Sequence, residues 1–376
     1  MSYKVAIDMC YFYKVHMGGK DEVAYNLLKG FDKIGVSDQV VCFTYKKIAD
    51  YISEINPNVK VCVVPKIRTG RFLGGFHFCF RNYYEERWVI KNNVPIILFP
   101  NKPTIKRRLR ITTIEIPHDI SIYEDIRASN CTDRQIVKQK KDIVDDFKYR
   151  DYIVAISDYD KSTMIKHLPW GKDKITRIYD PIYFGDRVSY GQKKYITALN
   201  IQWEHKNVKT LIKAFSRIAS KIEYDLILVG RYPETIEELR RLVSEHKLED
   251  RVKFTGFVSN EEMSSIIDKT RIYVNASLFE GFGMTAVEMM GRGVPTIVAE
   301  NTAQPEVTMG LCKYYSPTED SVALAEKIMD EINNPTSEKE LDRIAEAVRA
   351  RYSYEVIAKD YWDLIMSTLK GGDIQS

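Results

Sequence analysis

The sequence predicts an α/β protein made of two Rossmann-like, doubly wound parallel-sheet domains. Short apolar runs of strand length alternate with amphipathic segments of helix length along the whole chain, a pattern typical of parallel sheets covered by helices. The 376 residues exceed what one hydrophobic core usually serves, so two domains are expected. With 44% hydrophobic and 29% charged residues, the composition is that of a globular enzyme.

Apolar runs in the first half predict six strands: Lys4–Ile7, Gln39–Thr44, Val59–Val64, Pro95–Phe99, Ile111–Ile116 and Tyr152–Ile156. Helical spacing is found between them, as in Glu22–Lys33. Two stretches, Pro65–Tyr84 and Ile126–Phe147, are less regular.

The second half repeats this alternation. Its expected strands are Tyr195–Leu199, Tyr224–Val229, Val252–Thr255, Ile272–Val274 and Thr296–Ala299. Its expected helices are Val208–Lys221, Thr235–His246, Glu261–Lys269, Ser321–Ile332, Ser337–Arg351 and Tyr354–Leu369. Pro181, Gly185 and Gly191 punctuate a polar stretch between the halves. We therefore expect domains at residues 1–185 and 186–353, followed by a terminal helix in residues 354–376.

Ligands of open parallel sheets bind at the carboxyl ends of the strands. Two such sheets facing each other would leave a cleft that suits a reaction between two substrates. The pattern alone fits a two-domain dehydrogenase or a sugar-nucleotide epimerase equally well.

Charge and cysteine content exclude some classes of protein. A net charge of +4, from 56 basic and 52 acidic residues, is too small to indicate a nucleic-acid binder. The six cysteines are scattered without a C-x-x-C pair, as expected for reduced core residues of a cytosolic protein. The N-terminus lacks the long apolar stretch of a signal peptide or membrane span, so we expect a cytoplasmic protein.

The most informative segment runs from Asn275 to Ala299, where a strand enters a Gly-Phe-Gly loop that opens a helix. Glycines at both ends of the loop Gly281-Phe282-Gly283 let the backbone approach a ligand closely. The free N–H groups of Met284 and Thr285 at the helix start can hold a diphosphate.

Two glutamates bracket this loop with seven residues between them. Glu288, about one turn into the helix, can accept hydrogen bonds from two ribose hydroxyls, and Glu280 can accept them from a transferred sugar. One loop can thus hold all three parts of a nucleotide sugar. The alternative is an ordinary strand–turn–helix with two solvated acids.

These two acids and two glycines, with the helix that ends before Pro295, resemble the signature of a known enzyme family. It is the large family of retaining, nucleotide-sugar-dependent glycosyltransferases with the GT-B fold, often called family 4, whose hallmark is E-x7-E. The resemblance covers nearly the whole chain. It implies that the terminal helix, preceded by Arg351-Tyr-Ser-Tyr, crosses back onto the first domain.

Three further segments of the second domain are similar to this family's donor site. Val252–Val258 resembles the strand and loop whose backbone, near Gly256 and Phe257, contacts the nucleobase. Ile227-Leu-Val-Gly-Arg resembles the family's strand that ends in a glycine beside the diphosphate. That glycine is Gly230 in this chain, and Arg231 follows it. The loop Glu204-His-Lys-Asn-Val resembles the one in which a lysine, here Lys206, grips the diphosphate.

In the first domain, Gly18-Gly19 resembles the glycine turn that faces the donor phosphates and the acceptor. Ile116-Pro-His118-Asp119 resembles the family's histidine loop at the sugar site, which implies a catalytic role for His118 beside Glu280. Taken alone, His118 is better explained as a packed strand-end histidine, and its position in the matching loop favours the sugar contact. Val154-Ala-Ile-Ser157 matches the strand–Ser–helix that follows.

The sequence departs from the family at one place. The family commonly carries an arginine about five residues before the lysine, but Asn200, Ile201 and Gln202 occupy this region. The second cation for the diphosphate is therefore Arg231 or Lys209, or is missing.

Other sites are weaker alternatives. Asp158-Tyr-Asp160 has the D-x-D spacing of a metal site, but its position directly after a strand favours acids of a helix start. We expect no metal or other cofactor. The fingerprint G-x-G-x-x-G is absent after the first strand, which argues against a dehydrogenase.

Two basic stretches lie in the first domain, Lys66–Arg71 and Lys106–Arg110. Aromatic residues follow the first: Phe72, Phe76, Phe78, Phe80, Tyr83 and Tyr84. Such stretches suit an anionic membrane surface and hence a lipid-linked acceptor and a peripheral location at the inner face of the membrane. A solvated loop is an equal alternative, and no motif supports nucleic-acid binding.

The sequence therefore predicts a retaining hexosyltransferase. It would move a sugar from a GDP-, UDP-, dTDP- or ADP-sugar to a hydroxyl of a glycan or lipid-linked acceptor, in polysaccharide or glycoconjugate biosynthesis. The alternatives are a GT-B-fold sugar-nucleotide epimerase or phosphorylase, and a nucleotide-sugar-binding protein without catalysis.

Overall fold

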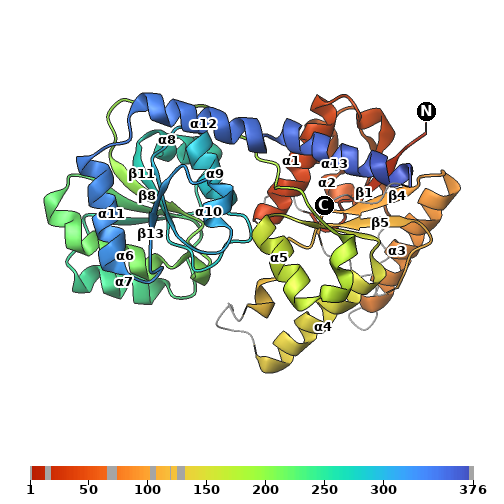
Figure 1. Cartoon of the computed structure of the whole chain (residues 1–376), viewed down its shortest axis with the longest axis horizontal. Helices are drawn as coiled ribbons and strands as arrows, with labels where there is room; N and C mark the ends of the chain where they lie inside the picture. The colour runs from red at the N-terminus through yellow and green to blue at the C-terminus, as the bar shows by residue number, and fades with distance from the viewer. Residues whose placement is uncertain are drawn as a thin grey trace. The chain divides into compact units, whose positions relative to one another are not determined.

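A computed structural model describes residues 2–12, 18–65, 74–101, 107–118, 120–124 and 132–371, with backbone only for 74–80. The chain divides into two compact units (Figure 1). The first contains the described residues up to Tyr123, Thr132–Tyr183 and the described chain from Tyr352 onward, and the second contains Phe184–Arg351 together with Glu124. No helix among the described residues is both long and apolar enough to cross a membrane.

The described part of the first unit contains a seven-stranded sheet in the order β3-β2-β1-β4-β5-β6-β7. Every neighbouring pair of its strands is parallel. The strands are β1 Val5–Asp8, β2 Val40–Thr44, β3 Lys60–Val63, β4 Ile96–Phe99, β5 Thr112–Glu115, β6 Tyr152–Ala155 and β7 Ile175–Arg177. The direction of winding reverses between β1 and β4, where such sheets place their ligands.

The second unit has a six-stranded parallel sheet in the order β10-β9-β8-β11-β12-β13. Its strands are β8 Tyr195–Leu199, β9 Asp225–Val229, β10 Val252–Gly256, β11 Thr270–Asn275, β12 Thr296–Ala299 and β13 Lys313–Tyr315. Winding reverses between β8 and β11. The predicted fold class, two doubly wound α/β domains, is confirmed.

Helices cover both sheets. In the first unit they are α1 Gly19–Lys33, α2 Lys46–Ile55, α3 Gly74–Lys91, α4 Asp133–Tyr149, α5 Asp158–His167 and α13 Tyr354–Leu369. In the second they are α6 Val208–Ile218, α7 Ile236–Glu245, α8 Asn260–Asp268, α9 Met284–Gly291, α10 Gln304–Val307, α11 Ser321–Asn333 and α12 Glu338–Tyr352, whose last residue belongs to the first unit.

All eleven expected strands are present, with ends that differ by at most two residues. The short edge strands β7 and β13 were not predicted. The two stretches that the sequence left irregular contain most of α3 and α4, so that prediction was wrong there. Helix α4 begins with a capping box in which Thr132 and Gln135 exchange hydrogen bonds.

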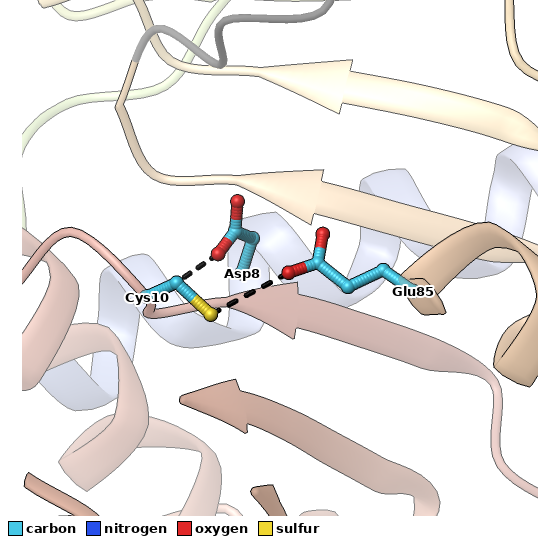
Figure 2. Close-up of side chains that lie close together, drawn as sticks. All are labelled: Asp8, Cys10 and Glu85. Carbon is cyan, nitrogen blue, oxygen red and sulfur yellow. Dashed lines mark hydrogen bonds between the residues drawn. The ribbon is translucent and has the colours of Figure 1, made fainter. Parts of the chain in front are cut away.

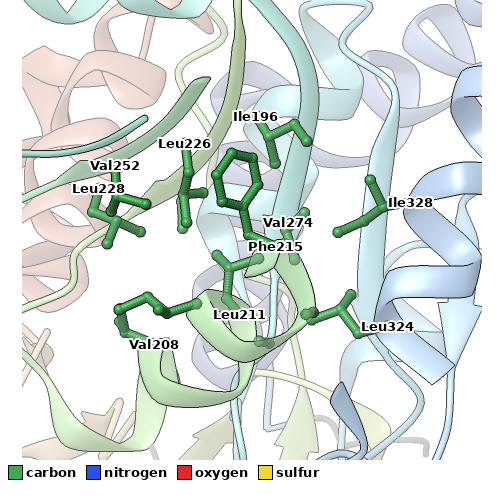
Figure 3. Packing of buried hydrophobic residues seen from close by; sticks show 14 of the residues in the cluster. Ile196, Val208, Leu211, Phe215, Leu226, Leu228, Val252, Val274, Leu324 and Ile328 are labelled. Atoms are coloured by element: carbon green, nitrogen blue, oxygen red, sulfur yellow. The ribbon is translucent and has the colours of Figure 1, made fainter. Parts of the chain in front are cut away.

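The core of the second unit lies between α6, α11 and one face of the sheet (Figure 3). Phe215 of α6 is fully buried there with Ile196, Leu226 and Val274 of three strands. Burial of this apolar surface fixes the sheet, and with it the loops at the carboxyl ends of its strands.

The last helix, α13, packs against α1 within the first unit. Gly30 of α1 makes the close approach possible, because a Cβ atom there would lie 2.4 Å from Cβ of Ala358. The rings of Phe31 and Trp362 meet edge to face at 6.0 Å beside this crossing. The C-terminal helix is therefore a structural part of the unit that begins the chain.

Candidate functional site

The candidate site of the second unit lies at the carboxyl ends of β8, β9, β10 and β11. Glu280, in the loop after β11, and Lys206, in a short turn after β8, form an ion pair of 2.6 Å. Both side chains are nearly buried, with exposed fractions of 11% and 13%. Two residues that the sequence assigned separately to sugar and diphosphate are thus in direct contact.

Among the described residues, every hydrogen bond to the Glu280 carboxylate goes to one of its two oxygens. Its Oε1 accepts from Lys206 Nζ at 2.6 Å, Ser277 Oγ at 2.8 Å and Asn275 Nδ2 at 3.2 Å. Burial by itself would raise the pKa of Glu280, but Lys206, His205 and the Ser277 hydroxyl outweigh it and hold this pKa below its ordinary value. Glu280 is therefore a carboxylate at neutral pH.

Backbone and side-chain bonds fasten the Lys206 turn to the end of β11. Leu278 N donates to the carbonyl oxygen of His205 at 2.8 Å. Asn207, left-handed at φ 53°, donates from Nδ2 to the carbonyl oxygen of Ala276 at 3.2 Å. These bonds hold Lys206 over the Glu280 loop without help from a ligand.

The start of α9 supplies the anion-binding end of the site. Gly283 precedes the helix with φ 94°, a left-handed conformation that favours glycine. The backbone N–H groups of Met284 and Thr285 have no acceptor among the described residues, as expected for the first turn of a helix. Glu280 lies against this turn, since a Cβ atom on Gly283 would be 3.7 Å from its Cγ.

The side chains of this loop differ in exposure. Phe282 is buried, and Gly281 and Thr285 are half-buried. Glu288, one turn into α9, has a 34% exposed side chain whose Oε1 lies 3.9 Å from Nη1 of Arg292. Glu280 and Glu288 thus start from one loop–helix segment, as the sequence predicted.

The loops after β9 and β10 meet at a bridge between Gly230 and Gly256. Gly230 has φ 140°, and a Cβ atom there would lie 2.5 Å from Oε1 of Gln202. Beside this bridge, the guanidinium of Arg231 lies 6.0 Å from the ring of Phe257, which is 70% exposed. The structure therefore brings an aromatic face and a cation together at the ends of β9 and β10.

The structure separates the two candidates for the second cation. Lys209 lies on the exposed surface of α6 and pairs with Glu238 at 2.6 Å. Arg231 lies in the loop that carries Gly230. Gln202, from the segment where the family carries an arginine, packs against Gly230.

In the first unit, Gly18 precedes α1 and Gly19 is its first residue, and both are exposed. His118 follows β5 with φ 70°, which is uncommon for a residue other than glycine. It is buried, and its Nε2 lies 2.7 Å from the carbonyl oxygen of Pro100, so this nitrogen carries the proton. Asp119, next to it in the predicted histidine loop, lies outside the described residues.

A second charged cluster lies at the end of β1. Asp8, Cys10 and Glu85 place their ligand atoms within 4.8 Å of one another, an arrangement that can hold a metal ion (Figure 2). Buried Arg81 already lies 3.5 Å from each of the two carboxylates. The guanidinium supplies the positive charge that a metal would bring, so the cluster is an ion-paired part of the core.

The acids of the D-x-D stretch start α5, as the sequence favoured. Ser157 caps the helix by accepting from Asp160 N at 2.9 Å. Asp160 is buried and accepts from Ile156 N at 3.2 Å, while Asp158 pairs with Arg177 at 3.3 Å.

Sequence reasoning missed the polar side chains that support the site. Asn275 and Ser277 hold Glu280, Asn207 holds the Lys206 turn, and Tyr273 donates from its hydroxyl to Thr285 Oγ1 at 2.8 Å. The sequence signal that could have identified them is a set of polar residues at the end of a buried strand, in Tyr273-Val-Asn-Ala-Ser277.

Comparison with known proteins agrees with this geometry. Residues 182–351 match the family described as Glycosyl transferases group 1. The chain is 25% identical to O-antigen chain mannosyltransferase RfbU of Salmonella typhimurium over 310 residues, 80% of this chain and 84% of that protein.

Solved structures share the fold. Sucrose-phosphate synthase from Thermosynechococcus elongatus has a TM-score of 0.72 at 16% identity, covering 98% of this chain and 100% of that one. Anabaena HepE in complex with UDP-glucose has a TM-score of 0.72 at 16% identity, covering 98% and 99%.

The two parallel-sheet units have the GT-B fold of these solved structures, and the second unit carries a loop–helix bracketed by two glutamates. Residues 182–351, nearly all in the second unit, carry the match to the group 1 glycosyltransferase family, and this match covers less than half of the chain.

Proposed function

We propose that the protein transfers a hexose from a nucleoside-diphosphate sugar to a hydroxyl of a glycan or lipid-linked acceptor, with retention of configuration. The contact between Lys206 and Glu280 beside the start of α9 carries the proposal. A cation and a row of backbone donors suit a diphosphate, and the adjacent carboxylate suits sugar hydroxyls.

Each part of the donor has a proposed partner. The diphosphate would lie at the N–H groups of Met284 and Thr285, near Gly230, Arg231 and Lys206. The ribose would bind Glu288, and the base would lie along Gly256 and Phe257, where the exposed ring offers a stacking face. The sugar would bind Glu280 and the backbone of Gly281–Gly283.

In the proposed mechanism, charge stabilisation of the departing nucleoside diphosphate supplies most of the catalysis. The acceptor hydroxyl attacks from the side of the leaving group and gives its proton to the departing phosphate, which retains the anomeric configuration. Lys206, Arg231 and the helix start provide the positive potential, so no metal is needed. His118, with Gly18 and Gly19, is proposed to act on the sugar and acceptor from the first unit.

The relatives support a place in polysaccharide biosynthesis. The matched Salmonella protein is named an O-antigen chain mannosyltransferase. We therefore propose that this chain also adds a hexose to an O-antigen-type glycan, and GDP-mannose is the first donor to test.

A peripheral membrane location is part of the proposal. On α3, Tyr83 and Ile90 are 52% and 45% exposed. Glu86 of the same helix forms an ion pair with Arg107 of the loop before β5. Arg108 and Arg110 line a shallow hollow of about 420 Å³. Basic and apolar groups together suit an anionic lipid surface. The stretch 66–73, Lys106, and the side chains of Phe76, Phe78 and Phe80 lie outside the described residues.

The test is thermal stabilisation by GDP-, UDP-, dTDP- and ADP-sugars, with and without EDTA, on the native protein and on Glu288→Ala. A ligand of the folded state raises the melting temperature. We expect one nucleotide family to stabilise the native protein, regardless of EDTA, and to lose its effect in the variant. Stabilisation that needs metal and ignores Glu288 would contradict the donor site.

Turnover then separates the enzyme classes. Glycan product formed only with acceptor, with the anomeric configuration read by NMR, supports a retaining transferase. Epimerised or phosphorolysed donor without acceptor would contradict it, and intact donor binding without turnover would indicate a binding protein.

A further inference from the structure

We propose that Asn275 and Ser277 are positioning residues for recognition of the donor sugar, acting through Glu280. They hold one carboxylate oxygen of Glu280 so that the other is presented to a sugar hydroxyl. The inference rests on the proposed function and assigns a task to two side chains that no sequence motif identified.

The first step is that the two carboxylate oxygens of Glu280 have different hydrogen-bond partners. Oε1 accepts from Asn275 and Lys206 and from Ser277, whose one hydroxyl proton it shares with Oδ1 of Asn275, whereas the described residues donate no hydrogen bond to Oε2. A carboxylate oxygen has two lone pairs that a sugar hydroxyl can use. Oε2 is therefore the oxygen available to the ligand.

The second step concerns what remains when a donor binds. Lys206 is proposed to contact the diphosphate, so its hydrogen bond to Oε1 of Glu280 weakens in the complex. Ser277 and Asn275 are 0% and 3% exposed and lie under the loop, where a ligand does not displace them. They are the two donors that keep Glu280 in place in both states.

The third step is the rigidity of the two residues themselves. Oδ1 of Asn275 accepts from the backbone N of Ser277 at 3.2 Å, which closes a small turn at the end of β11. This strand is paired on both sides, with β8 and β12. The position of Glu280 is thus fixed by a central strand of the sheet, and a precise binding geometry requires such rigid support.

The experiment compares each nucleotide sugar with its own diphosphate, because only the sugar should depend on Glu280 placement. Calorimetric titration would use GDP-mannose against GDP and UDP-glucose against UDP, on the native protein, Ser277→Ala and Asn275→Ala. Thr197→Val is the matched control, since it removes a buried hydroxyl of the same sheet that bonds Thr270 instead. Melting temperatures are recorded for every variant.

We expect Ser277→Ala and Asn275→Ala each to weaken the nucleotide sugar about fivefold to tenfold, the size of the net contribution of one hydrogen bond. Affinity for the diphosphate alone should change less than about twofold, and Thr197→Val should alter neither. The loss should grow as pH falls from 7 to 5.5, because removing a donor to Oε1 raises the pKa of Glu280.

Equal losses for nucleotide sugar and diphosphate would indicate a merely structural role and overturn the inference, as would no loss in either variant. Should Ser277→Ala fail to fold, Asn275→Ala decides alone. If the native protein binds none of the GDP-, UDP-, dTDP- and ADP-sugars, the proposed function itself fails, and that result is distinct from a native protein that binds while its variants are unaffected.

Discussion

At the scale of residues, the Lys206–Glu280 pair shows how a nearly buried acid keeps its charge at neutral pH. A carboxylate that loses water needs donors, and Glu280 obtains three of them at one oxygen. Because burial of an unpaired ion is costly, the loss of either partner affects the one that remains. The two residues should therefore not behave as independent contacts.

Replacing Lys206 tests the diphosphate contact. Lys206→Ala should weaken both the nucleotide sugar and the nucleoside diphosphate at least about tenfold, since a charge-assisted bond to phosphate is lost. Lys209→Ala is the matched control, because Lys209 is exposed and pairs only with Glu238 on the surface. It should change affinity less than about twofold. Titration calorimetry measures both, and similar losses would contradict the assignment.

Tyr273 lies fully inside the second unit and donates to Thr285 Oγ1 at 2.8 Å. A hydroxyl that accepts from tyrosine directs its own proton elsewhere, here toward the proposed diphosphate. Tyr273→Phe should thus weaken the nucleoside diphosphate about threefold to tenfold, as expected for one neutral hydrogen bond. Tyr315→Phe, which removes a hydroxyl bonded to the carbonyl of Thr318, is the control. An unchanged diphosphate affinity in Tyr273→Phe would refute this role.

The residues proposed to face the donor were predictable because their types and spacing form a motif. Glu280, Gly283 and Glu288 were named from the sequence alone. Asn275 and Ser277 were not, since a polar residue at a strand end has many structural uses. Only the coordinates show which atom each one contacts.

At the scale of elements, strands were predicted better than the helices of the first unit. Helix α3 was missed because its inward face is charged: Arg81 and Glu85 are buried at positions where periodicity expects apolar residues. Strands β7 and β13 have three residues each and pair on one side only, so they carry little pattern. The Thr132–Gln135 capping box was a usable signal for α4.

Packing of α13 on α1 gives a prediction at this scale. Gly30→Ala would place a Cβ atom 2.4 Å from Ala358 Cβ and 2.5 Å from the carbonyl oxygen of Tyr354. The free energy of unfolding of the first unit should fall by about 1–3 kcal/mol, the usual cost of overpacking.

Gly171→Ala is the control, since its nearest neighbour would be a Phe147 carbon at 3.8 Å. Chemical denaturation followed by fluorescence measures both variants. Equal stabilities would show that the two helices can separate without cost.

At the scale of the whole molecule, one buried acid makes stability depend on pH. Burial raises the pKa of Asp180 to about 8. The folded chain therefore holds a proton that the unfolded chain releases near pH 4, so this residue lowers the free energy of unfolding as pH rises from about 4 to 8.

Asp180→Asn removes this dependence. The melting temperature of the variant relative to the native protein should rise between pH 5 and pH 8, corresponding to at least about 1 kcal/mol. A difference that stays constant over this range would show that Asp180 is ionised in the folded state. Scanning calorimetry at both pH values is the measurement.

The path of the chain through its two units has a consequence for protein engineering. Apart from Glu124, the described residues of the second unit form one segment, Phe184–Arg351, whereas the first unit is completed by residues on both sides of that segment. Where the chain leaves and re-enters the first unit, Ile182 N donates to the carbonyl of Tyr352 at 2.8 Å and Tyr354 N to the carbonyl of Ile182 at 3.1 Å. The two cut points are neighbours, so a short glycine linker can join them. The second unit can then be excised as a fragment of its own, and donor recognition can be assayed apart from transfer.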